Sequence, residues 1–355
     1  MSNSYLNKTL GTPTNSKKFT FSAWVKKSSN KSGGHYLLDT VGQSSGSENP
    51  IAFDGDQKFR VGEYTGSNVY NYRSNAQFRD LSGWYHCVVQ GDSTQNTASD
   101  RIKLYVNNQL LTSDTNEYPT QDYDFKFNVS GNVIYVGRGI SNSGRNMDGY
   151  MAHVAFVDGS VVAPTVFGET DSTSGIWKFK SPSGVTWGTN GVHLKFENSG
   201  NLGLDSSGQT NNFTTNGNLK QALDTPSNVH NTGNPLYVWN YSLSHSNGNL
   251  SFAGSQNQWQ GAATNLAISK GKWYYEAKFT SATDIGNWGV GFMGREDYNL
   301  TNATRNFVGF YNYDGGEIWV ANVSNSTPTT ADYGTFANGD IIGIALDYDN
   351  EYISV

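Results

Sequence analysis

The chain has 355 residues, enough for two domains, and its 18 Phe, 21 Tyr and 9 Trp imply packed apolar cores that exclude intrinsic disorder. A formal net charge of −6, with no run of Lys or Arg longer than two, argues against a nucleic-acid-binding groove. The single cysteine, Cys87, excludes a disulfide framework, and no apolar run approaches the ~20 residues that cross a bilayer, so we expect no membrane insertion.

Residues 19–26 show the period-two alternation of a half-buried β-strand, with an apolar face formed by Phe19, Phe21, Ala23 and Val25. Residues 84–89 and 101–106 alternate in the same way, and a polar loop joins them. Asn107 and Asn108 close the second of these strands, because Asn tolerates the positive φ of a tight turn. Each strand has one apolar face to bury, so a second sheet must cover them and the sequence predicts a β-sandwich.

Shorter stretches complete this first sandwich and are interpreted as strands: residues 35–39, 51–53, 58–61, 132–136 and 149–157. Residues 63–79 are interpreted as an aromatic, polar loop, and residues 137–148 as a second loop. No helical period extends beyond about two turns, so the predicted fold class is all-β.

Residues 161–191 are punctuated by Pro and Gly and contain the edge of the first domain. The stretch 193–213 fits two interpretations that the sequence leaves open: a linker, or a circularly permuted edge strand that returns to the first sandwich. Asp224–Asn228 is interpreted as a turn-rich hinge. The expected organisation is therefore a first sandwich over 1–185, a linker or permuted edge strand over 186–235, and a second sandwich over 236–355.

The second sandwich is expected from five strands. Residues 271–279 place Trp273, Tyr275, Ala277 and Phe279 on one face. Four more strands are expected at 288–293, 307–311, 317–320 and 340–346. Together the two halves predict two β-sandwiches in tandem.

Motifs in the first half point to a known family. They are FTFSAWVK at 19–26, GWYH at 83–86, KLYVNN at 103–108, DGYMAHVAF at 148–156 and FGE at 167–169. This order resembles laminin-G-like, concanavalin A-like jelly rolls, in the version found in virion and tail-fibre proteins of marine bacteriophages. The resemblance implies a jelly-roll sandwich and a phage protein located in the virion, assembled in the cytoplasm of the host bacterium and in contact with other virion proteins.

The second half has motifs of its own: KWYYE at 272–276, WGVGF at 288–292 and NGDIIGIALDYDN at 338–350. This set resembles the SPRY domain, a second kind of concanavalin A-like sandwich. In SPRY domains the segment like GDIIGIALDYDN leads into further strands, whereas the sequence stops at Val355. The SPRY-like sandwich is therefore expected to be incomplete at its C-terminal end.

No catalytic residue is predicted, and the chain is expected not to be an enzyme. The stretch 42–46, GQSSG, has the spacing of a nucleophile elbow but is not followed by a helix. Glycoside hydrolysis needs two opposed carboxyl groups, and the nearest acid pair, Glu169 and Asp171, lies in a turn-rich segment. His86 and His153 lie in strands without metal-ligand spacing and are interpreted as satisfied core or face residues. A glycan-degrading enzyme is the most distant alternative.

Carbohydrate binding fits the composition better, because aromatic faces stack on the C–H surfaces of sugars while Asn, Asp and Arg bind their hydroxyls. The candidate residues in the first domain are Tyr64, Tyr70, Tyr72, Asn142, Arg145 and Asn146. Those in the second domain are Trp259, Trp288, Tyr298 and Tyr313. Asp148 is a candidate calcium ligand, since laminin-G-like domains often hold calcium at the rim of the sandwich. No other cofactor is expected.

The expected function is a bacteriophage appendage, a tail fibre or a capsid-decorating fibre, that adheres to host-surface polysaccharide. The alternative is a purely structural virion protein that packs on neighbouring subunits without a ligand. Fibres of this type commonly form trimers, and weak sugar sites gain from several copies binding at once, so a homo-oligomer is expected in the virion. The isolated chain lacks long apolar heptads and is expected to be monomeric or weakly associated.

Overall fold

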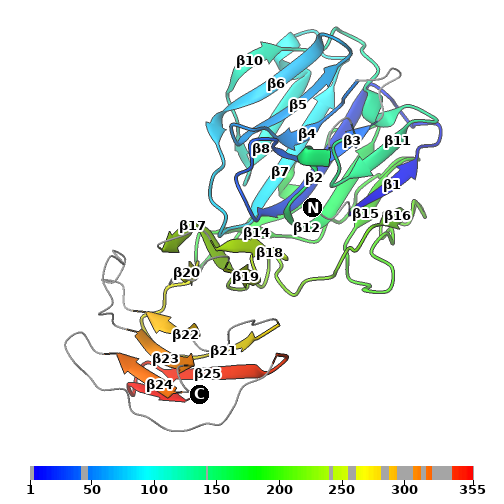
Figure 1. Cartoon of the computed structure of the whole chain (residues 1–355). Coiled ribbons are helices and arrows are strands. Elements are labelled where there is room, and N and C mark those ends of the chain that lie inside the picture. Colours follow the sequence, from blue (N-terminus) through cyan, green and yellow to red (C-terminus); the bar gives the residue numbers. More distant parts are fainter. Residues whose placement is uncertain are drawn as a thin grey trace. The chain divides into compact units, whose positions relative to one another are not determined.

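The computed structural model describes residues 4–40, 47–140, 143–239, 243–254, 261–280, 288–293, 307–312, 317–321 and 338–354. They form two compact units (Figure 1). The first comprises Met1–Leu236 and His245–Ala253, and the second comprises Tyr237–Ser244 and Gly254–Val355. The described residues contain no α-helix, so the predicted all-β class is confirmed. None of their helical turns is long and apolar enough to cross a membrane.

The first unit is built around two large antiparallel sheets (Figure 1). The larger has eight strands in the order β10 (Ser113–Glu117), β6 (Asn68–Gln77), β5 (Lys58–Tyr64), β4 (Ile51–Phe53), β3 (His35–Thr40), β11 (Val133–Val136), β1 (Tyr5–Thr9) and β16 (Thr214–Asn216). The smaller has six in the order β15 (Val192–Leu194), β12 (Gly149–Asp158), β2 (Lys18–Lys27), β7 (Tyr85–Asp92), β8 (Ile102–Val106) and β9 (Gln109–Leu110). One apolar core contains residues of both sheets, so they form a sandwich.

The predicted central pair of strands is confirmed. β7 and β8 are antiparallel neighbours, with Cys87 opposite Val106 and Val89 opposite Leu104. These four side chains are buried in the core, as are the predicted apolar residues of β2. The turn after β8 is also as expected, because Asn107 and Asn108 have φ angles of 49° and 65°.

The outer face of the six-stranded sheet is covered as well, which the alternation does not predict. His86 stacks with Trp24 of β2 and with Trp177, at centroid distances of 4.8 and 5.9 Å. Trp177 begins β14 (Trp177–Phe179), which pairs with β13 (Gly168–Thr170). A second apolar cluster lies beside it, where Ala155 and Val157 of β12 contact Phe167, Val185 and Trp187. The segment that follows β12 therefore packs back onto this sheet.

A buried ion pair fixes the end of that segment. Lys26 Nζ lies 2.7 Å from Asp224 Oδ2, and their side chains are only 1% and 4% exposed. The other carboxylate oxygen of Asp224 accepts a hydrogen bond from Trp84 Nε1 (3.0 Å) and one from the backbone N–H of His230 (3.2 Å). Asp224 thus binds the outer face of the six-stranded sheet, at the position where the sequence alone suggests a hinge.

The segment 186–235 supplies an edge strand to each sheet. Val154–Phe156 of β12 pair with β15, and Tyr5–Asn7 of β1 pair with β16. Asn190 and Asn211 add side-chain hydrogen bonds to this region, with the Asn190 amide contacting both Gly11 and Asn128. The strands that follow are β17 (Gly233–Trp239), β18 (Ser244–Ser246), β19 (Ser251–Ala253) and β20 (Gly261–Thr264).

The second unit has two three-stranded antiparallel sheets. One has the order β21 (Lys272–Lys278), β25 (Ile341–Asp347) and β26 (Tyr352–Ser354), and the other has β22 (Trp288–Met293), β23 (Phe307–Asn312) and β24 (Glu317–Ala321). All five predicted strands are present. Ile342 and Ile344 of one sheet contact Val290 and Phe292 of the other, so the sheets pack face to face.

The Lys26–Asp224 pair predicts a large stability difference between two single substitutions. Asp224→Ala leaves the Lys26 ammonium buried without a carboxylate, which should lower the unfolding free energy by about 3–5 kcal/mol. Asp100→Ala removes the partner of Lys103 in an exposed pair and should cost less than about 1 kcal/mol. Urea unfolding of the first unit, followed by tryptophan fluorescence, compares them. Equal effects would contradict the clamping role of Asp224.

His86 predicts a pH dependence. Trp177 Nε1 donates to His86 Nδ1 (3.0 Å), so Nε2 carries the proton and donates to Ser22 Oγ (2.9 Å). Burial lowers the pKa of His86 to about 3, below its value near 6.5 in an unfolded chain. The unfolded state therefore binds more protons in that window, and stability falls as the pH drops from about 6.5 towards 3.

The variant His86→Gln should lose this contribution. Its unfolding free energy should vary less steeply with pH than that of the wild type, by up to about 1.4 kcal/mol per pH unit. Urea unfolding at a series of pH values between 3.5 and 7 measures both slopes. Parallel profiles would show that His86 titrates alike in the folded and unfolded chains.

Candidate functional site

The outer face of the eight-stranded sheet is the surface that the covering segment leaves available. Tyr36 of β3, Ala52 of β4, Arg60 of β5 and Arg73 of β6 lie directly opposite one another across four neighbouring strands. Their sequence neighbours point into the core: Leu37, Ile51, Phe53, Phe59, Val61 and Tyr72. Because side chains alternate along a strand, this row lies on the outer face, where Tyr36 and Ala52 are buried and Arg60 and Arg73 are partly exposed. We call this surface the polar face.

A hydrogen-bonded cluster of three side chains stands at one end of the row. The Tyr36 hydroxyl donates to Glu48 Oε2 (2.7 Å) and accepts from Arg145 Nη1 (3.1 Å), and Arg145 also forms an ion pair with Glu48. The Arg145 guanidinium lies 5.6 Å from the centre of the Tyr36 ring. Burial, together with the hydrogen bond to Glu48, raises the pKa of Tyr36 well above its ordinary value. The hydroxyl therefore remains a donor.

Asp39 holds the two loops that carry this cluster. One of its carboxylate oxygens accepts from the backbone N–H groups of Thr40 (2.9 Å) and Asn49 (3.0 Å). The other accepts from the N–H of Ile140 (3.0 Å). Burial raises the pKa of Asp39 to about 7, against the opposing effect of these N–H donors. The loop after β3 and the loop after β11 are thus joined at one buried carboxyl group.

Tyr64 presents an exposed ring beside the cluster. The backbones of Tyr64 and Glu48 form two hydrogen bonds, from Tyr64 N to Glu48 O (2.8 Å) and from Glu48 N to Tyr64 O (3.0 Å). The preceding residue, Glu63, turns inward, where it accepts a hydrogen bond from Tyr123. The Tyr64 side chain is 41% exposed. The fold therefore brings together Tyr64 and Arg145, two residues that the sequence predicts as ligand contacts.

Two of the other predicted contacts are wrong. Tyr70 and Tyr72 were expected in a loop, but they lie in β6 and face the core, with exposures of 0% and 8%. The Tyr70 ring contacts Tyr123 and Phe125, and the Tyr72 ring contacts Tyr118. A buried ring cannot stack on a sugar. The alternation of Tyr70, Asn71, Tyr72 and Arg73 was the signal for a strand that the Gly and Ser around it concealed.

The remaining predicted residues of the first unit have different roles. Asn146 is buried, and its side-chain oxygen accepts from the backbone N–H of Gly139 (3.2 Å), so it shapes the loop. Asp148 is exposed and accepts a hydrogen bond from Ser29 Oγ (2.8 Å). Within the described part of the chain, no three His, Cys, Asp or Glu side chains gather as metal ligands. Calcium binding at Asp148 stays a prediction.

The other predicted site residues lie in parts of the chain that the structure describes incompletely or not at all. Asn142, Trp259, Tyr298 and Tyr313 lie outside the described residues. Trp288 begins β22, but its side chain is not described. Reasoning from sequence missed Tyr36, Asp39, Glu48 and Arg60. Only Arg60 carried a signal, as a charged residue between Phe59 and Val61 in a short apolar strand.

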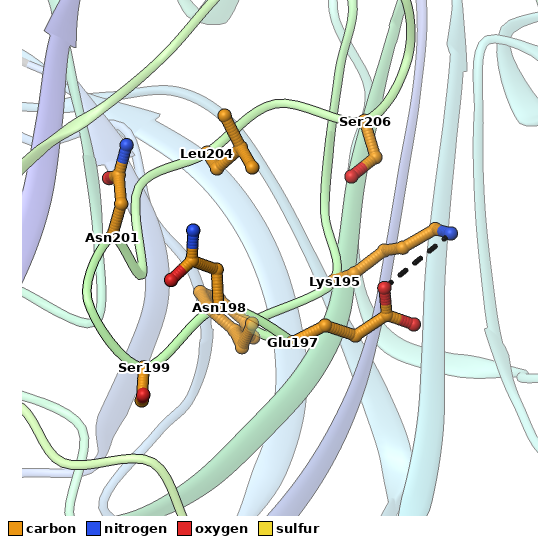
Figure 2. A pocket seen from close by; sticks show the side chains of 8 residues that line it. Lys195, Glu197, Asn198, Ser199, Asn201, Leu204 and Ser206 are labelled. Carbon is orange, nitrogen blue, oxygen red and sulfur yellow. Dashed lines mark ion pairs between the residues drawn. The ribbon is translucent and has the colours of Figure 1, made fainter.

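A pocket of about 370 Å³ lies elsewhere in the first unit, just after β15 (Figure 2). It is lined by Lys195, Phe196, Glu197, Asn198, Ser199, Asn201, Leu204 and Ser206. The side-chain oxygens of Asn198 and Asn201 accept from the backbone N–H groups of Gly200 (2.9 Å) and Gly203 (3.2 Å). Its one aromatic residue, Phe196, packs against the core. The pocket thus offers polar groups without the exposed ring of the polar face.

Comparison with known proteins identifies both domains. Residues 2–167 match the family model described as the concanavalin A-like lectin/glucanases superfamily, and residues 272–354 match the SPRY domain model. Together with the all-β structure, these matches confirm the predicted tandem of concanavalin A-like sandwiches. Among curated proteins, none matches the chain.

Solved structures also match part of this chain. A heptameric SAP-like pentraxin from Limulus polyphemus matches 52% of this chain and 82% of its own, at 12% identity and a TM-score of 0.35. The CBM40 of Ruminococcus gnavus IT-sialidase, bound to α2,3-sialyllactose, matches 46% of this chain and 95% of its own, at 12% identity and a TM-score of 0.32. The enzymatically active domain of bacteriophage CBA120 tailspike protein 2 matches 46% of this chain and 24% of its own, at 10% identity and a TM-score of 0.28. At such values no ligand or activity is transferred from them to this chain.

Asp39 generates a prediction about the loops of the polar face. Asp39→Ala removes the acceptor of three backbone N–H groups, which should lower the unfolding free energy by about 3 kcal/mol. Hydrogen exchange at the amides of Asn49 and Ile140 should become faster. The control Asp80→Ala loses hydrogen bonds to Ser82 in an exposed turn and should leave both amides unchanged. Unchanged exchange in Asp39→Ala would contradict the joining role of this carboxyl group.

Proposed function

We propose that the first sandwich binds carbohydrate on the polar face and does not hydrolyse it. The observation that carries this proposal is the exposed Tyr64 ring, held by two backbone hydrogen bonds beside the Tyr36–Glu48–Arg145 cluster. A sugar stacked on Tyr64 would meet Arg145 as a hydrogen-bond donor and Glu48 as an acceptor. Such a combination of one apolar face with a few fixed polar groups is typical of carbohydrate sites.

Binding without hydrolysis is supported by the ion pairs of the acids near this face. Glycoside hydrolysis uses two carboxyl groups on opposite sides of the scissile bond, one of them protonated as the general acid. Glu48 is paired with Arg145, while Asp54 and Asp56 are both paired with Arg73. Carboxylates that arginines of the protein already engage suit a fixed polar binding surface better than the opposed pair that hydrolysis needs.

The proposed setting is a bacteriophage particle, and it rests on the resemblance of the first domain's motifs to virion and tail-fibre proteins. There the ligand would be host-surface polysaccharide, and the partners would be other virion proteins. A trimer would present several weak sugar sites at once and convert low affinity into firm adhesion. Immunogold labelling of purified particles with an antibody to this chain tests the setting separately from ligand binding.

The ligand-binding proposal predicts the effect of Tyr64→Ala. Bacterial surface polysaccharides immobilised on an array are probed with the fluorescently labelled full chain, and affinities for the glycans bound are measured in solution. Tyr64→Ala should weaken binding by about tenfold or more, equivalent to about 1.4 kcal/mol. Circular dichroism and the melting temperature should not change, because the ring is exposed.

The matched control is Tyr348→Ala, which removes a tyrosine of similar exposure (46%) from the second unit. It should bind like the wild type. Equal binding by all three proteins would move the site away from Tyr64. Failure of the wild type to bind any glycan would favour the alternative of a structural virion protein that packs on its neighbours without a ligand.

A further inference from the structure

Arg60 occupies the middle of the polar face, with a small residue on two of its sides. Ala52 lies beside it on β4, between Arg60 and Tyr36. Gly62 is the next residue of β5 on the same face. A Cβ atom at Gly62 would lie 3.0 Å from the Tyr70 carbonyl oxygen and 3.4 Å from Asn71 Oδ1, so a side chain there would crowd β6. The face next to Arg60 therefore carries no bulky side chain at Ala52 and Gly62, whereas Lys58 and Arg73 adjoin Arg60 on its other sides.

The charge of Arg60 is not balanced by an ion pair, in contrast to its neighbours. Arg73 pairs with Asp54 and Asp56, Arg145 pairs with Glu48, and Lys58 pairs with Asp114. Arg60 forms neither a hydrogen bond nor an ion pair within the described part of the chain, and its Nε is buried without a partner. It also lies directly opposite Arg73, an arrangement of like charges that destabilises a sheet. An anion bound at this position would pair with Arg60 and would reduce its repulsion with Arg73.

Asn71 supplies an acceptor next to this donor. It lies opposite Gly62 on β6 and is therefore diagonal to Arg60, a neighbour within reach of one ligand. Its Oδ1 is buried and has no hydrogen-bond partner in the described ranges of the chain. The polar face thus holds one cationic donor and one neutral acceptor that both lack partners among the residues that the structure describes. Buried polar groups ordinarily have partners, so this pair points to a ligand.

We propose that the carbohydrate bound by the polar face is acidic, with its carboxylate on the Arg60 guanidinium and a hydroxyl donating to Asn71 Oδ1. The planar fork of an arginine matches the two oxygens of a carboxylate. The ring of the same sugar chain stacks on Tyr64 at the end of β5, and Arg145 contacts the adjoining unit. This inference rests on the proposed function and adds the ligand class, a sugar that carries a carboxyl group.

The test uses the full chain and pairs of probes that differ in one charged group. Polygalacturonate, alginate, hyaluronate and a set of uronate-containing bacterial capsular polysaccharides are each assayed beside their carboxyl-reduced, neutral forms. Dextran sulfate serves as the sulfated probe. We expect binding of at least one carboxylated glycan, and a loss of about tenfold or more in affinity when its carboxyl groups are reduced.

Variants connect this binding to Arg60. Arg60→Gln should lower the affinity for the carboxylated glycan by about tenfold or more, because a charge-assisted pair is lost. The control Arg79→Gln removes an exposed arginine with the same change of net charge and should leave affinity unchanged. Arg60→Gln should also melt at the wild-type temperature or above, since it removes a charge opposite Arg73. A marked fall in melting temperature would make Arg60 a structural residue and overturn the proposal.

Other outcomes separate this inference from the function on which it rests. Binding only to neutral glycans, weakened by Tyr64→Ala, would overturn the acidic ligand and leave carbohydrate binding in place. Binding to dextran sulfate but to no carboxylated glycan would also overturn it. Absence of binding to every glycan tested would count against the proposed function itself.

Discussion

The burial of one outer face of the first sandwich decides which surface can meet a ligand. Lys26 carries a charge to a position that is 1% exposed, and Asp224 holds it there from 198 residues further along the chain. With the Trp24–His86–Trp177 stack, this pair holds the segment after β12 on the six-stranded sheet. The eight-stranded sheet keeps its outer face, and the polar groups of that face are the ones available for recognition.

The polar face combines a rigid support with incomplete neutralisation of charge. Asp39 joins the two loops through three backbone N–H groups, so Glu48 and Arg145 meet Tyr36 in one arrangement. The other cations of the face have carboxylate partners, whereas Arg60 has none among the described residues. A face that serves only for packing gains nothing from an arginine without a carboxylate partner. A binding face does gain, because a ligand then supplies the missing partner.

The sequence predicts the strands of this protein better than its site. Alternation correctly assigned the faces of β2, β7 and β8, because each has an apolar side that only a core can accommodate. It failed at β6, where Tyr70 and Tyr72 supply core rings to a strand whose other residues are mostly polar. The site depends on contacts that no local pattern encodes. Glu48 and Arg145 are 97 residues apart, and Asp39 and Ile140 are 101 apart.

A crystal structure of the full chain with a bound glycan tests the central claim most directly. The account predicts a sugar ring against Tyr64, with its polar groups on Arg60, Asn71 or Arg145. A glycan bound in the pocket lined by Asn198, Asn201 and Leu204, with the polar face empty, would contradict it.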